Sequence, residues 1–436
     1  MATDPRILRG DVFSRLPPEL LAAIHGRLGL VDRFAFAAAL GAWRARHLLT
    51  KLEAPCLVLP GSTAAAVTAT ATTCLFSLSD RRSDTPRYPP DPAMRAPVVV
   101  LGSSGGWLVT ADAQGQLWMA NPVTGEQADL PAITTIPLLR WSEPTRSFLV
   151  DVDGFLQMRY SGGGAPPQIV DGTVQRGTAT TTSLSAEQLR NWFYRKVILS
   201  GPPRSGGGYS AMLILARQYG APAFATAEHP EWRLAPYRDA VEDAIFHRGR
   251  FYSITYSGML ESWDHQHGGG GLLTSTTVAP ALDLQGHQKY RKYLAAAPDG
   301  RLVTVLKQCG RRTVGFRVLV LDEELGRWEE VGGAAADDML IGKAALFVGM
   351  NSSACVATAE RPGLRPGCIY FTNDQLGLAY QDWELLQLSV DAGLGPGQRD
   401  WDVGVFSLSD GMVEKILGLR AVHPFWPLPA WFLPSV

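Results

Sequence analysis

Few residues of this 436-residue chain stand at spacings that could carry chemistry. The stretch GPPRSGGG at 201–208 is rich in glycine, but it lacks the Lys-Ser/Thr pair with which a phosphate loop binds phosphate and metal. His265 and His267 flank a glycine run, yet two ligands do not complete a metal site. The patterns H-E-x-x-H and C-x-x-C do not occur. We therefore predict no catalytic residue, no metal site and no cofactor.

Composition narrows the class of protein further. Hydrophobic residues make up 46% of the chain and charged residues 19%, which suits a folded core and excludes a mostly disordered chain. The net charge of -1 gives no basic surplus for nucleic acid. The N-terminus lacks the apolar stretch of a secretory signal, and no apolar run approaches the ~20 residues of a membrane span. We expect no nucleic-acid or membrane partner.

The cysteines indicate a reducing compartment. They are odd in number and scattered along the chain, which favours free thiols and a cytoplasmic or nuclear location, or both. The five are Cys56, Cys74, Cys309, Cys355 and Cys368.

The elements that could position a binding surface begin with a helical head at 13–43. Pro17 and Pro18 suit the first turn of a helix, where a missing N–H costs nothing. Gly29 is expected to end this helix, and Asp32 to cap the next one. The apolar residues of the first helix fall within an arc of roughly 100 degrees at 3.6 residues per turn. They are Leu20, Leu21, Ile24 and Leu28.

The second helix of the head is apolar on two sides. Phe36, Leu40 and Trp43 share one face at spacings i, i+4 and i+7, while Phe34 points roughly opposite. A helix in so small a domain cannot bury two faces internally, so the pattern predicts a partner.

From Cys74 onward the chain indicates short strands separated by Gly, Pro and Asp. Strand pairs are expected at 106–122, 147–160, 250–264 and 300–322. Asp153-Gly154, Asp299-Gly300 and Asp410-Gly411 are hairpin-type dipeptides. Long loops are expected at 161–185, 201–208, 264–271 and 391–400, and the proline-rich C-terminal stretch PFWPLPAWFLPSV is expected to pack its aromatic residues on the body without forming a regular element.

Similar strand-group endings at EQADLP, EWRLAP and RWEEVG imply a repeat of about 50 residues, the size of a β-propeller blade. Six blades are predicted, with seven as the alternative count, and the strand at 56–59 helps to close the ring. A β-sandwich or two small β domains remain the alternative folds. The expected blades are 74–131, 132–171, 192–236, 241–280, 290–331 and 339–416.

The head resembles the F-box, through the pattern L-P-x-E-L-L-x-x-I followed by a tryptophan some two dozen residues later. The turn before Trp43 is AALGA, where the F-box usually has a basic, cysteine-containing turn. The segment 345–374, with VGVFSLSDG at 403–411 and PAWFLPS at 429–435, is similar to the KIB-type (kelch-like) β-propeller domain of plant F-box proteins. The resemblance implies an F-box at 11–52, a linker or closing strand at 53–73 and a propeller at 74–436.

The resemblance also implies a function. Such proteins are non-catalytic substrate receptors of SCF-type ubiquitin ligases, whose F-box binds an adaptor, and through it a cullin, while the propeller binds a target protein. The alternatives are a propeller interaction module with a decayed F-box, and an enzyme with His, Asp or Glu clustered around the central channel. The residues expected to bind the adaptor are Leu16, Pro17, Leu20, Leu21, Ile24, Leu28, Leu30, Phe34, Phe36, Leu40 and Trp43.

Overall fold

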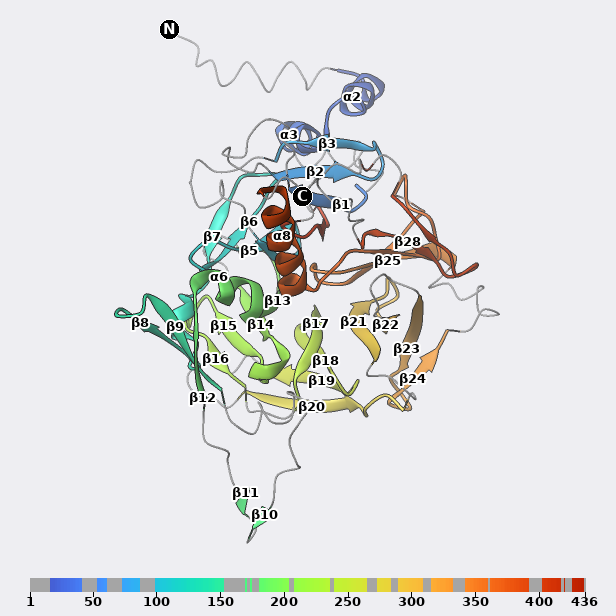
Figure 1. Ribbon diagram of the computed structural model, residues 1–436. Coiled ribbons are helices and arrows are strands. Elements are labelled where there is room, and N and C mark those ends of the chain that lie inside the picture. Colours follow the sequence, from blue (N-terminus) through green and yellow to red (C-terminus); the bar gives the residue numbers. More distant parts are fainter. Residues whose placement is uncertain are drawn as a thin grey trace.

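Strands of two to seven residues dominate the structure, a computed structural model (Figure 1). It describes residues 16–40, 53–60, 73–86, 99–152, 169–170, 173–174, 180–203, 208–235, 239–264, 273–283, 289–308, 315–331, 342–359, 361–391, 402–416, 419 and 426–434. No helix in these ranges combines the length and the apolar composition needed to cross a membrane.

Four sheets are antiparallel meanders of four strands in sequence order, as expected for propeller blades. The first holds β4 (Val99–Ser104), β5 (Trp107–Ala111), β6 (Leu117–Ala120) and β7 (Gln127–Asp129). The second holds β13 (Tyr194–Leu199), β14 (Ser210–Leu215), β15 (Ala223–Thr226) and β16 (Arg233–Leu234). The third holds β17 (Val241–His247), β18 (Arg250–Thr255), β19 (Leu260–Asp264) and β20 (Thr274–Ala279). The fourth holds β21 (Tyr290–Ala296), β22 (Leu302–Gln308), β23 (Phe316–Asp322) and β24 (Arg327–Glu330).

A five-stranded sheet follows, in the order β26-β25-β27-β28-β29. Its strands are β25 (Ala344–Val348), β26 (Ala354–Ala357), β27 (Cys368–Phe371), β28 (Gly404–Ser407) and β29 (Val413–Glu414). β25 and β27 run parallel, and the connection between them contains β26, which pairs antiparallel with the other edge of β25.

The sixth sheet joins strands from the two ends of the described chain. Its order is β3-β2-β1-β30, and Cys56 to Val58 pair with Phe432 to Ala430. Its strands are β1 (Cys56–Pro60), β2 (Thr73–Ser77), β3 (Arg82–Asp84) and β30 (Ala430–Phe432). β30 corrects the expectation of no regular element, because the prolines flank Ala430–Phe432 and leave these three residues free to pair. The aromatic side chains do pack on the body, since Trp431 and Phe432 are fully buried.

The sheets are arranged in a closed ring (Figure 1). Clusters of buried apolar side chains lie between each sheet and the next one around this ring. One cluster, for example, joins Phe224 of β15 to Phe251 and Trp263 of the next sheet. Another joins Phe347 of β25 to Trp431 of β30, and so closes the ring. The fold is thus mainly β and has the sheet arrangement of a propeller, as predicted.

The described part of the segment expected as a second blade, 132–152 with 169–170, does not occupy a place in the ring. β8 (Leu139–Ser142) and β9 (Ser147–Val152) pair with β12 (Thr180–Leu184), in the order β12-β9-β8. β4 lies directly against β13, so this three-stranded sheet lies outside them. The close approach requires Gly102, where an added Cβ would lie 2.1 Å from the carbonyl oxygen of Val197.

The strand pairs at 106–122, 250–264 and 300–322 are present, whereas 153–160 lies outside the described residues. Gly300 and Gly411 have positive φ at their hairpins. The expected loop 161–185 contains β12 and the small hairpin of β10 (Ile169–Val170) and β11 (Thr173–Val174).

Helices are few in the described chain, and one of them was not predicted from the sequence. The 16-residue helix α8 (Leu376–Asp391) follows β27 and precedes β28 in the chain, and it lies inside the ring in Figure 1. It contacts the short π-helix η3 (Leu189–Phe193). The others are α2 (Pro18–His25), α3 (Leu30–Leu40), α6 (Ala186–Gln188) and the single turns η2 (Ile133–Thr135) and η4 (Arg217–Tyr219).

Candidate functional site: the helical head and a buried charge network

The head consists of α2 and α3 at the rim of the ring, beside β2 and β3 (Figure 1). Its boundaries differ from expectation, because α2 ends at His25 and α3 already begins at Leu30. The cap of α3 also differs. The carboxylate of Asp84, at the end of β3, accepts a hydrogen bond from the Leu30 N–H, and Asp32 lies in the first turn.

One face of α3 is buried against the propeller. Leu30, Val31 and Phe34 belong to the same apolar cluster as Cys56 and Val58 of β1. Their exposed fractions are all below a tenth, and Ala37 is equally buried. The propeller itself is therefore the partner of this face.

Polar contacts of Arg33 also hold α3 in place. Arg33 of α3 donates to Asp80 (2.9 Å) and to Glu53 (3.3 Å), and its Nε donates to the carbonyl oxygen of Leu28 (3.0 Å). Burial opposes the charge of Arg33, but the hydrogen bond that Arg33 donates to Asp80 and the carboxylate of Glu53 raise the pKa of Arg33 above its usual value. Burial likewise raises the pKa of Glu53, against the effect of Arg33.

The remaining residues of the expected adaptor surface lie in different surroundings. Leu20 is 51% exposed, Pro17 is exposed, and Leu21 is buried. Those half-buried are Leu16, Ile24, Leu28 and Phe36. Phe36 lies 6.4 Å from His25 between ring centroids, so α2 and α3 contact each other. The side chain of Leu40, and Trp43 as a whole, lie outside the described residues.

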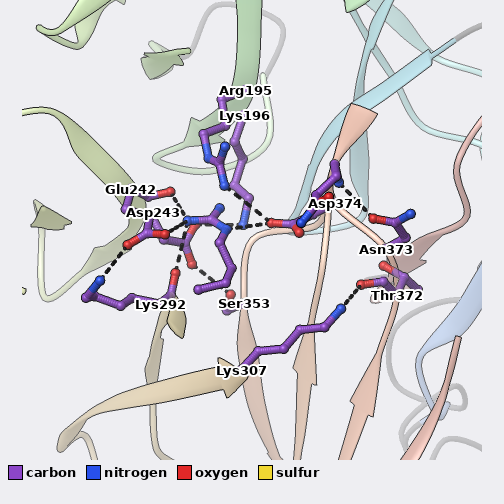
Figure 2. A network of polar contacts seen from close by, with 12 residues as sticks. Arg195, Lys196, Glu242, Asp243, Lys292, Lys307, Ser353, Thr372, Asn373 and Asp374 are labelled. Carbon is purple, nitrogen blue, oxygen red and sulfur yellow. Dashed lines mark hydrogen bonds and ion pairs between the residues drawn. The ribbon is translucent and has the colours of Figure 1, made fainter. Parts of the chain in front are cut away.

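A buried charge network that the sequence patterns did not predict joins β13, β17 and β21 of three neighbouring blades (Figure 2). Asp243 of β17 is fully buried and accepts three hydrogen bonds. The donors are Lys196 Nζ of β13 (2.6 Å), the N–H of Leu294 of β21 (2.9 Å) and Ser353 Oγ (2.9 Å). One carboxylate thus connects four separate segments of the ring.

Glu242 and Asp374 extend the network. Glu242 contacts Lys292 (3.0 Å) and Arg291 (3.2 Å). Asp374, which follows β27, contacts Arg291 (2.7 Å) and Arg195 (3.8 Å). Burial alone would raise the pKa of Asp374, but Arg291 and Arg195 hold it well below the usual range. The side chain therefore stays ionised inside the protein.

The sequence does contain a signal for this network. A charged dipeptide stands near the start of three otherwise apolar strands, in YRKVIL, VEDAIFH and YRKYLAA. Two of these repeat the letters YRK. Charged residues are almost never buried unless paired, so opposite dipeptides in apolar strands predict mutual ion pairs.

The network does not have the composition of a catalytic site. A general base must be free to accept a proton, and each of these carboxylates already contacts a Lys or Arg. No histidine belongs to it, and the described residues hold no group of three His, Cys, Asp or Glu arranged for a metal ion. The spacing G-x-S-x-G does occur at 102–106, but there Ser104 Oγ donates to the carbonyl oxygen of Leu199 (3.5 Å).

Comparison with known proteins agrees with this architecture. The model of the KIB1-4 β-propeller family matches residues 75–407. A putative F-box protein from Arabidopsis thaliana is 30% identical over 145 residues, which is 30% of this chain and 34% of the relative. An F-box protein from the same plant is 28% identical over 139 residues, 30% of this chain and 39% of the relative. The match thus spans little more than a third of either relative. The resemblance to a plant F-box protein with a KIB-type propeller is confirmed, and the chain belongs to the KIB1-4 β-propeller family.

Proposed function

We propose that this chain is the substrate-recognition subunit of an SCF-type E3 ubiquitin ligase. The observation that carries the proposal is a head with the F-box pattern seated on the rim of a KIB1-4 propeller. The head binds the adaptor, and through it a cullin, and the propeller binds the target. The free cysteines Cys56, Cys74, Cys355 and Cys368 suit the reducing cytoplasm or nucleus in which such ligases act.

The adaptor surface is the side of the head that the propeller leaves uncovered. It includes exposed Leu20 and the half-buried residues Ile24, Leu28 and Phe36. An apolar patch on two short helices fits an apolar groove of a partner. In this proposal Leu30 and Phe34 shape the head from within, since they contact the propeller.

The chain itself needs no catalytic group for this role. The transfer of ubiquitin is carried out by other subunits, and the receptor contributes proximity by holding the target near the charged conjugating enzyme. This agrees with a buried charge network whose carboxylates are all paired.

The test is capture of the full chain by a purified adaptor. Leu20→Asp places a charge on the apolar contact and is expected to reduce capture at least tenfold, without changing the thermal unfolding midpoint. The matched control is Leu325→Asp, at an exposed leucine of the β23–β24 turn. Undiminished capture of Leu20→Asp would show that the head does not act as an F-box.

A second candidate is a propeller interaction module without a ligase role. It is favoured by the propeller covering one face of α3, and by the sequence AALGA before Trp43, which lacks the basic and cysteine residues usual there in the F-box. If the wild-type chain copurifies with neither adaptor nor cullin, this candidate replaces the first.

A further inference from the structure

Two adjoining cavities lie at one end of the β13–β16 blade, away from the head. The larger has a volume of about 380 Å³, at the lower end of the range for ligand pockets. Its apolar wall is formed by Phe224, Phe246 and Leu273. The smaller has a volume of about 340 Å³ and shares four residues with it, namely Glu228, His229, Glu231 and Arg233.

The shared rim is held in place by hydrogen bonds. The N–H of His229 donates to Thr226 Oγ1 (3.1 Å) within the turn that follows β15. Next to it, Trp232 is 1% exposed and its indole N–H donates to the carbonyl oxygen of Pro131 (3.1 Å). A rim that is already ordered costs a ligand little conformational entropy.

The rim carries negative charge that is open to a ligand. Glu228 and Glu231 are both exposed, and neither has an ion-pair partner among the described residues. Arg233 lies on the wall and already interacts with another group. A cationic side chain would therefore meet two unpaired carboxylates at the rim.

We propose that these cavities bind an extended segment of the target protein that carries an apolar residue and, two positions away, a lysine or arginine. In an extended chain residues i and i+2 point the same way, about 7 Å apart, which suits two adjoining cavities. The apolar side chain occupies the cavity walled by Phe224 and Phe246. The cation reaches Glu228 and Glu231.

The proposal rests on the proposed function only in taking the ligand to be a protein segment. Its test uses the full chain and a randomised heptapeptide library displayed on phage. Wild-type protein is expected to enrich peptides with the apolar-x-Lys/Arg pattern. The double variant Glu228→Lys/Glu231→Lys is expected to enrich Asp or Glu at the basic position.

Affinity is then measured by fluorescence polarisation with the best selected peptide. The charge reversal is expected to weaken binding at least tenfold, and Ala227→Trp, which fills the larger cavity from an exposed position, should do the same. The control is Glu323→Lys/Glu324→Lys, two exposed carboxylates on another blade, which should leave binding within twofold. Thermal unfolding reports whether each variant is folded.

Selection of no peptide, selection without a basic position, or unchanged affinity after charge reversal would each overturn the proposal. Capture by the adaptor is measured separately, with wild type and Leu20→Asp. If peptide binding fails while wild-type capture is intact, the peptide site alone is refuted. If the wild-type chain is not captured but still binds the peptide, the ligase role alone is refuted.

Discussion

At the residue scale, Asp243 shows why removing a single charge from the buried network destabilises the fold. Its side chain has no exposed surface, and Lys196, at 1% exposed, lies 2.6 Å away. Burial lowers the pKa of Lys196, although the charge of Asp243 opposes this shift. The lysine depends on this carboxylate, because an unpaired buried charge is far more costly than a paired one.

We predict that Asp243→Ala destabilises the protein by about 3–5 kcal/mol, because it leaves Lys196 buried without a counter-charge. Equilibrium unfolding in urea measures the loss. Glu323→Ala, which breaks the exposed pair with Arg248, should cost less than about 1 kcal/mol. Equal losses of unfolding free energy for the two substitutions would mean that the buried pair stabilises the fold no more than the exposed pair.

Asp374 yields a prediction about pH. Its folded-state pKa lies below that of an unfolded Asp, about 3.9, so ionised Asp374 stabilises the fold above that pH, and the contribution is lost as pH falls toward the folded pKa. The stability difference between wild type and Asp374→Asn should be constant above pH about 5 and shrink below pH about 4. Urea unfolding between pH 3 and 7 measures it. A difference that grows on acidification would contradict this assignment.

At the element scale, α3 is capped and ion-paired by the propeller. Arg33→Ala removes hydrogen bonds to Glu53 and Asp80, each worth about 1.5–3 kcal/mol when charged groups are involved. Amide hydrogen exchange in α3 should accelerate at least tenfold, while β13–β24 keep their protection. Arg27→Ala, at an exposed position of the head, is the control. Unchanged exchange would show that the apolar face alone holds the head.

The elements also show what sequence patterns can and cannot predict. The pairs β5–β6, β18–β19 and β22–β23 follow from short strand-like stretches separated by Gly, Pro and Asp, which are local signals. α8 was missed because it interrupts a strand-rich region. The seating of Leu30 and Phe34 was missed because their partners on β1 follow some twenty residues later, and apolar periodicity does not say which surface covers it.

The same reason applies to the charge network. Lys196 and Asp243 are 47 residues apart, and Arg291 and Asp374 are 83 apart. Their pairing depends on the order of blades around the ring, which short repeats did not define. The segment 132–171 was predicted to be a blade, and 74–131 was predicted to be a single blade although β2 and β3 belong to the closing sheet and β4–β7 form a sheet of their own.

For the whole molecule, the closing sheet holds the ring together. Trp431 of β30 is fully buried and lies 5.1 Å from Phe347 between ring centroids. Trp431→Ala should destabilise the propeller by about 3–5 kcal/mol, as large-to-small changes in cores do. Thermal unfolding measures it, with Trp141→Ala, at 42% exposed, as the control. A loss no larger than that of the control would mean that the ring does not depend on this closure.

The pairing of β1 with β30 also has a consequence for synthesis on the ribosome. The sheet that seats the head receives its innermost strand only when residues 430–432 have been made, more than 350 residues after α3. Until then α3 lacks its complete seat, although its sequence has long left the exit tunnel. Messages with an early stop codon would yield heads without a closed ring beneath them, which cellular quality control can recognise by their exposed apolar surface.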